Sequence, residues 1–265
     1  MKHTRKRILC ILAAAAVTAC SLPQSTPLLR SAVTVSAAES SGTCGENCTW
    51  TLDGEGTLRI SGEGKMNDYT DDAPVPWKAQ RKNIKAAVIC DGITYIGKNA
   101  FDGCSGLEAI MIPESVTGIG ESAFYGCASL ESVAVPKGVT QIAKLTFQGC
   151  SGLTEIDLPN GITEIGDYAF YGCRLLEKIS LPDSDLSMGR GVFTACNRIR
   201  DITFRMTTDN QCCGNSGTQT VSGDLKEEHT TVKSLLSDLS HEVELTMADD
   251  AGKTVCKLVF PEYYE

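Results

Sequence analysis

The chain has 265 residues, of which 42% are hydrophobic and 22% are charged. This is an ordinary globular composition, and the chain is long enough to build a core. Its formal net charge of −9 argues against nucleic acid and anionic lipid as partners, because an acidic surface repels both.

Residues 1–38 are predicted to be an export signal. Four basic residues precede an apolar stretch, Ile8 to Val17, which is too short to span a bilayer. Val35-Ser36-Ala37 fits an ordinary signal-peptidase site, whereas Val17-Thr18-Ala19-Cys20 fits a lipobox in which Cys20 would carry a lipid anchor. Either outcome predicts a secreted or cell-surface protein. No other segment approaches 18 apolar residues, so no transmembrane helix is expected.

Removal of the signal makes the chain more acidic. Residues 1–38 hold five of the 24 Lys and Arg and none of the 33 Asp and Glu. The remainder carries 19 basic and 33 acidic residues, a net charge of −14, which strengthens the argument against nucleic acid.

Residues 41–83 are predicted to form a small β module that caps the rest of the chain. Thr49–Leu52 and Thr57–Ile60 both alternate polar and apolar residues, and the turn signal Asp53–Gly56 separates them, as in a hairpin. Trp77 follows a proline-containing loop and is expected to pack where the cap meets the next unit.

A 23-residue repeat occupies residues 84–205. Each unit contains the apolar pattern Leu-x-x-Ile-x-Ile-Pro and a short phrase that ends in cysteine. A fixed period of this length is typical of leucine-rich-repeat solenoids. The phrase occurs five times: Phe101–Cys104, Phe124–Cys127, Phe147–Cys150, Phe170–Cys173 and Phe193–Cys196.

The segment IPESVTGIGESAFYGC resembles the BspA-like leucine-rich repeats of bacterial surface and secreted proteins. The resemblance covers roughly residues 84–204, and GTCGENCTWTLDGEGTLRISGEGKMNDY resembles the cap module that often precedes such repeats. It implies a β-rich solenoid: a right-handed leucine-rich repeat coil with parallel strands, an N-terminal β cap and a small α+β C-terminal tail. We expect a short helical turn at the Ala-Phe step of each coil. The resemblance implies a binding or adhesion protein, with partners that differ between members.

The cysteines fall into two sets. The five at the ends of the phrases recur at the same place in each coil, so we expect a buried column of reduced thiols. The pairing of the other six in the exported chain stays open, although Cys44 and Cys48 could bridge or serve as small core residues. These six are Cys44, Cys48, Cys90, Cys212, Cys213 and Cys256.

The C-terminal residues divide into a polar linker, 206–223, and a helix plus hairpin over 224–265. Val232, Leu235, Leu236, Leu239 and Val243 follow helical spacing. Glu244–Met247 and Thr254–Phe260 are then predicted to be the hairpin strands. This tail could cap the solenoid or form a module of its own.

No catalytic or cofactor site is predicted. After export the only histidines are His229 and His241, both in the tail, and a lone histidine is usually a surface residue. The glycines follow the coil period rather than a phosphate loop, and no metal-ligand spacing occurs. The chain is therefore predicted not to be an enzyme, with no cofactor and no metal.

The outward strand positions are the predicted binding surface, because side chains on a strand alternate between faces. They form two columns that change from apolar near the cap, where Val88 and Met111 are expected to be exposed, to charged from Glu155 onward. Repeat proteins commonly bind on this face; the alternative is a plain solvent-facing sheet. The predicted binding residues are Val88, Ala109, Met111, Ala134, Glu155, Asp157, Lys178, Ser180, Asp201 and Thr203.

Two functions are compatible with these features. The first is a non-catalytic module that binds a protein or glycoprotein, or adheres to one, at the cell surface. The alternative is a structural or accessory envelope protein without a specific ligand.

Overall fold

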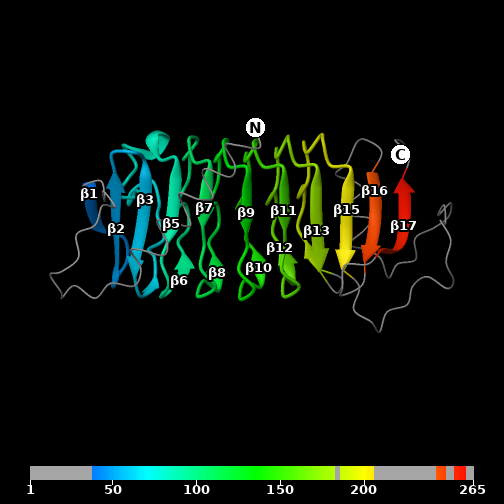
Figure 1. The fold of residues 1–265 in the computed structure, drawn as a ribbon, viewed down its shortest axis with the longest axis horizontal. Helices are drawn as coiled ribbons and strands as arrows, with labels where there is room; N and C mark the ends of the chain where they lie inside the picture. Colours follow the sequence, from blue (N-terminus) through cyan, green and yellow to red (C-terminus); the bar gives the residue numbers. More distant parts are fainter. Residues whose placement is uncertain (1–37, 183–185, 206–242, 249–253, 261–265) are drawn as a thin grey trace, which may run out of the picture.

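The computed structural model describes residues 38–182, 186–205, 243–248 and 254–260. It is a parallel-strand solenoid of about five coils, as the sequence predicts. An eleven-stranded sheet runs along the whole molecule (Figure 1). Its order is β1-β2-β3-β5-β7-β9-β11-β13-β15-β16-β17. Within the described residues, no helix is long and apolar enough to span a bilayer.

The solenoid strands of this sheet are all parallel and pair at the same repeat positions. Ile156, for example, lies between Val133 and Ile179, one coil on either side. A proline closely follows three of these strands and ends a fourth, and proline has no amide hydrogen to continue a ladder. These strands are β5 (Ala86–Ile89), β7 (Ala109–Met111), β9 (Ser132–Ala134), β11 (Glu155–Asp157), β13 (Lys178–Pro182) and β15 (Asp201–Arg205).

The second side of each coil is a short strand. These strands form two small parallel sheets, β4-β6-β8 and β10-β12-β14. The first contains β4 (Gly64–Lys65), β6 (Ile93–Ile96) and β8 (Gly118–Ile119). The second contains β10 (Gln141–Ile142), β12 (Glu164–Ile165) and β14 (Ser187–Met188).

The third side, the turn face, consists of residues 99–103, 122–126, 145–149, 168–172 and 191–195. The helical turn expected here is a run of hydrogen-bonded turns instead, because residues with positive φ, such as Ser122 (55°) and Gly126 (68°), interrupt right-handed helix. Successive turns are joined: the amides of Ser122, Phe124 and Gly126 donate to carbonyls one coil further on, over 3.1, 2.9 and 2.7 Å. The only helix in the described residues is the 3-10 helix η1 (Arg81–Asn83).

The core is built from columns of identical residues. The five repeat phenylalanines are fully buried, and adjacent rings stack 5.3 to 5.5 Å apart. Beside them lies the column of five cysteines, all buried free thiols, as predicted. Each thiol after the first donates to the carbonyl of the preceding coil's phenylalanine; Cys150 Sγ lies 3.2 Å from Phe124 O.

The cap extends the long sheet with β1 (Ala38–Thr43), β2 (Cys48–Asp53) and β3 (Thr57–Gly62). The predicted β2–β3 hairpin is confirmed, and β3 pairs in parallel with β5. Trp77 is fully buried where the cap meets the first coil, as expected. It packs edge-on against Trp50, and its Nε1 donates to Ala100 O over 3.0 Å.

The C-terminal hairpin continues the same sheet at its other end. β16 (Val243–Ala248) pairs in parallel with β15, and β17 (Thr254–Phe260) pairs antiparallel with β16. The predicted hairpin strands are thus present and lie against the last coil. The signal peptide was predicted to end at residue 38, but Ala38 begins β1, and Val243, predicted to be the last residue of the helical run, begins β16. The rest of the predicted signal peptide, the linker 206–223 and the rest of the helix predicted from residue 224 lie outside the described residues.

Candidate binding surfaces

The sheet face is the outward surface of β5 to β15, and it carries the predicted columns in exact parallel register. Ala109 lies beside Ser132, Glu155 beside Lys178, and Lys178 beside Asp201. Ala134, Glu155, Asp157 and Lys178 are exposed, whereas Ala109, Met111, Ser180, Asp201 and Thr203 are partly exposed. The strands therefore bring nine of the ten predicted residues to one accessible surface.

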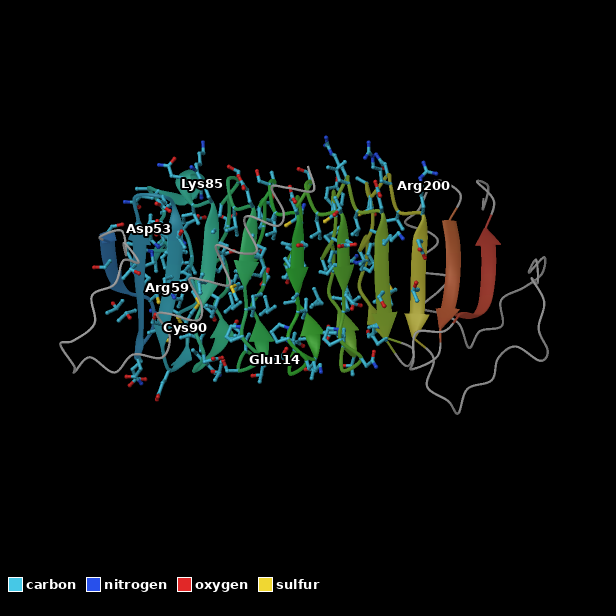
Figure 2. All side chains as sticks on the ribbon, in the orientation of Figure 1. Asp53, Arg59, Lys85, Cys90, Glu114 and Arg200 are labelled. Atoms are coloured by element: carbon cyan, nitrogen blue, oxygen red, sulfur yellow. The ribbon has the colours of Figure 1, made fainter. Side chains whose placement is uncertain are left out.

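Val88 is the exception, and its predicted exposure is wrong. It is only 1% exposed and forms a small apolar cluster with Cys90, Ala86, Ala109 and Met111. In the parallel register Val88 lies between Arg59 and Met111, whose long side chains flank it. The Arg59 guanidinium also lies 3.7 Å from Cys90 Sγ, and Figure 2 shows the two residues close together.

On the charged half of the sheet face, Lys178 and Asp201 form a weak ion pair. Lys178 Nζ lies 3.8 Å from Asp201 Oδ2, and both side chains are well exposed to water. Exposed pairs of this kind contribute roughly 0–1 kcal/mol. The charges of Lys178 and Asp201 therefore contribute little to folding stability, and both remain accessible to a partner.

The other cysteines differ in state. Cys44 and Cys48 are buried free thiols, so they serve as core residues and do not bridge. Burial, with a smaller effect from Cys48, raises the pKa of Cys44 to about 12. Cys90 is disulfide-bonded. Cys256 lies in β17, opposite Met247. Cys212, Cys213 and the predicted lipidation residue Cys20 lie outside the described part of the chain.

A cleft of about 430 Å³ opens where the cap loop meets the turn face. Lys78, Arg81 and Lys98 line it together with Asp71 and Asp102. Arg81 Nη1 lies 3.7 Å from Asp102 Oδ2, and Lys98 Nζ lies 2.8 Å from Glu121 Oε2. Burial raises the pKa of Asp102, an effect that the nearby Arg81 opposes.

The turn face also carries exposed aromatic rings, which the sequence reasoning missed. Of the described residues, the large hydrophobic side chains with the greatest exposure are Tyr125, Tyr168, Tyr171 and Leu175. The side chain after each repeat phenylalanine points outward. The sequence at that position could have been used to predict the exposure of Tyr125 and Tyr171. It is occupied in turn by Asp102, Tyr125, Gln148, Tyr171 and Thr194, so tyrosine alternates with polar residues.

Within the described residues, no group of three His, Cys, Asp or Glu is placed to hold a metal ion. His229 and His241 lie outside those residues. The described residues therefore offer three surfaces for binding: the sheet face, the cleft and the tyrosines of the turn face.

The model of the family described as "BspA type Leucine rich repeat region" matches residues 79–200 and 119–222, with six copies. No curated protein matches the chain.

Several solved bacterial structures are similar. A leucine-rich repeat protein from Treponema pallidum is 24% identical, with 59% of this chain and 90% of that one covered and a TM-score of 0.43. One from Bacteroides ovatus is 26% identical (60% and 48% covered, TM-score 0.40), so the chain spans about half of that protein. One from Eubacterium ventriosum is 20% identical (63% and 73% covered, TM-score 0.34). The family assignment rests on the sequence match.

Proposed function

Because the chain belongs to the BspA-type leucine-rich repeat family, we propose that it is an exported, non-catalytic protein that binds a protein or glycoprotein at the cell surface. The sheet face is the proposed site. The observation that carries the proposal is the continuous register of outward residues, which changes from apolar Ala109, Met111 and Ala134 to charged Glu155 and Asp157. An apolar patch beside polar groups is typical of protein interfaces.

The rigidity of this surface also favours binding. Each outward residue is held by hydrogen bonds of its strand to both neighbouring coils. A preorganised surface loses little conformational entropy when a partner docks. Repeat solenoids generally bind through such extended faces.

Export is supported by two features. The basic and then apolar N-terminus has the pattern of a signal peptide. The disulfide at Cys90 requires an oxidising compartment, which the exterior of a cell provides.

The mass of the intact protein tests export and the anchor together. A mature chain that begins at Ala38 or Glu39 indicates ordinary secretion, whereas a lipid-modified chain that begins at Cys20 indicates membrane anchoring. Recovery of the unprocessed chain from the cytoplasm alone would refute export.

Binding is tested in two stages. The purified chain is first used to capture partners from mucus and extracellular-matrix extracts, and a captured protein is then purified and titrated. Met111→Glu and Asp157→Lys should each weaken its binding roughly tenfold, as is usual for central interface residues. Asp157→Lys should leave the melting temperature unchanged, because the Asp157 side chain is exposed. Met111→Glu should lower it slightly, because Met111 packs against the buried Val88 and Cys90.

Lys137→Glu is the matched control, because Lys137 is exposed in the loop beyond β9, off the strand columns. It should leave the affinity unchanged. Unchanged affinity in the two sheet-face variants would exclude the sheet face as the site. Failure to capture any partner would favour the alternative function, a structural envelope protein without a specific ligand.

A further inference from the structure

We propose that the turn face is a second binding site, which takes an unbranched polysaccharide lying along the solenoid axis. Tyr125 and Tyr171 provide the two stacking surfaces, and Gln148 lies between them. This site is separate from the sheet face and does not depend on the function proposed for it.

The spacing of the rings is the first argument. Tyr125 and Tyr171 occupy the same repeat position two coils apart. The hydrogen bonds that join the turns keep the coils in register, so the two residues lie roughly 10 Å apart, twice the spacing between parallel strands. An extended sugar chain presents equivalent ring faces at every second residue, and that repeat is of the same order.

The exposure of the rings is the second argument. Tyr125 is 40% exposed and Tyr171 is 37% exposed, although the protein covers the rest of each side chain. Tyr168 contributes a further edge, with its ring centroid 6.0 Å from that of Tyr171. Rings that are already partly fixed lose little side-chain entropy when a ligand stacks on them.

The chemistry of the surface selects the ligand. The negative face of an aromatic ring attracts the weakly positive C–H bonds of a sugar ring. Gln148 offers both a donor and an acceptor to hydroxyl groups between the two stacked sugars. A continuous apolar groove, as a hydrophobic peptide would need, is absent from the described turn face because polar residues separate the tyrosines. The net charge of −14 in the exported chain disfavours single-stranded nucleic acid, which also stacks on tyrosine.

The cleft supplies one end of the site. Tyr125 lines it, so the row of tyrosines begins there. Among the described residues, Asp71 and the Lys78 ammonium have no hydrogen bond or ion pair and remain available to the hydroxyl groups of a terminal sugar. A carboxylate acceptor and an ammonium donor both suit sugar hydroxyl groups.

The test is calorimetric titration of the purified chain with xylohexaose, cellohexaose, chitohexaose and mannohexaose. At least one of these should bind, and the corresponding disaccharide should bind more weakly because it cannot reach both rings. Tyr125→Ala and Tyr171→Ala should each weaken binding of the hexasaccharide by about tenfold, from loss of one stacked ring. Tyr125→Phe should retain binding, because the ring remains.

Two controls separate this site from the rest of the molecule. Met111→Glu on the sheet face should not change the affinity for the sugar, and all variants should remain folded at the temperature of the titration. The proposal is overturned if none of the four hexasaccharides binds. It is also overturned if both alanine variants bind the hexasaccharide as tightly as the wild type does. The same holds if they weaken binding of the captured protein partner instead of the sugar.

Discussion

At the scale of single residues, each coil contains two positions in the left-handed region of φ and ψ. The second is glycine in four coils, for example Gly126 and Gly172, with φ of 68° and 73°, but Ala195 takes it in the fifth with φ of 62°. A residue with a Cβ atom costs about 1–2 kcal/mol there. At the first position the arrangement is reversed: glycine occurs only in the fifth coil, as Gly191, and the other four coils have Asn99, Ser122, Leu145 and Tyr168 there. Each coil therefore carries one strained residue, and in the fifth coil the strain lies at the second position.

This position gives a reciprocal pair of substitutions. Gly172→Ala should lower the free energy of unfolding by about 1 kcal/mol, purely from backbone strain, because no atom lies within 4 Å of the new Cβ. Ala195→Gly should raise it by a smaller amount, since glycine also gains entropy in the unfolded chain. Urea denaturation measures both. Equal stability of all three proteins would contradict the left-handed assignment.

At the scale of structural elements, the phenylalanine column connects all five coils. Phe147 stacks between Phe124 and Phe170, at 5.4 Å from each, and is fully buried. Phe147→Ala should lower the free energy of unfolding by about 3–5 kcal/mol, because it leaves a cavity at the centre of the column. The measurement is a denaturant titration.

Gln148→Ala is the control for this substitution. Gln148 is the next residue and is only partly buried, so its loss should cost less than about 0.5 kcal/mol. A wild-type stability in Phe147→Ala would mean that the rings do not hold the coils together.

At the scale of the whole molecule, buried thiols make stability depend on pH. Burial raises the pKa of Cys104 and of Cys150 from 9.0 to about 12, and that of Cys44 likewise. A thiol in the unfolded chain releases its proton at a lower pH than in the folded chain. The stabilisation is therefore complete below pH 9 and is lost progressively from about 9 to about 12.

The urea concentration at the midpoint of unfolding should accordingly be lower at pH 10.5 than at pH 7. Iodoacetamide should not label the cysteine column in the native protein at pH 8. Cys150→Ala removes one of the titrating groups and should show a smaller fall. A midpoint that does not change with pH, or rapid labelling, would place the thiols in contact with solvent.

Periodicity predicted much of this molecule. The recurrence of phenylalanine and cysteine every 23 residues was enough to predict the solenoid, the reduced thiols and the columns of the sheet face, because equivalent positions in stacked coils must meet. The burial of Trp77 at the junction of cap and solenoid could be predicted, because a large apolar side chain at the end of the cap is stable only if it is buried in the adjacent core.

What periodicity could not supply depends on neighbours outside the repeat. Val88 was predicted to be exposed because its strand position points outward, but Arg59 belongs to the cap and Cys90 replaces the proline of later coils, so the first coil has different surroundings. The tyrosines of the turn face were missed because that segment was expected to be helical. Its left-handed residues instead turn every position after phenylalanine toward solvent.

The sheet that joins every coil only to its two neighbours has a mechanical consequence. If the two ends of the solenoid are pulled apart, tension concentrates on the outermost coil, because no bond between the described coils spans more than one step. That coil peels away while the next one stays intact. Each detachment frees 23 residues, which extend to about 80 Å when fully stretched. The molecule would then lengthen in equal increments, and mechanical energy would be dissipated at each detachment instead of in one global unfolding event.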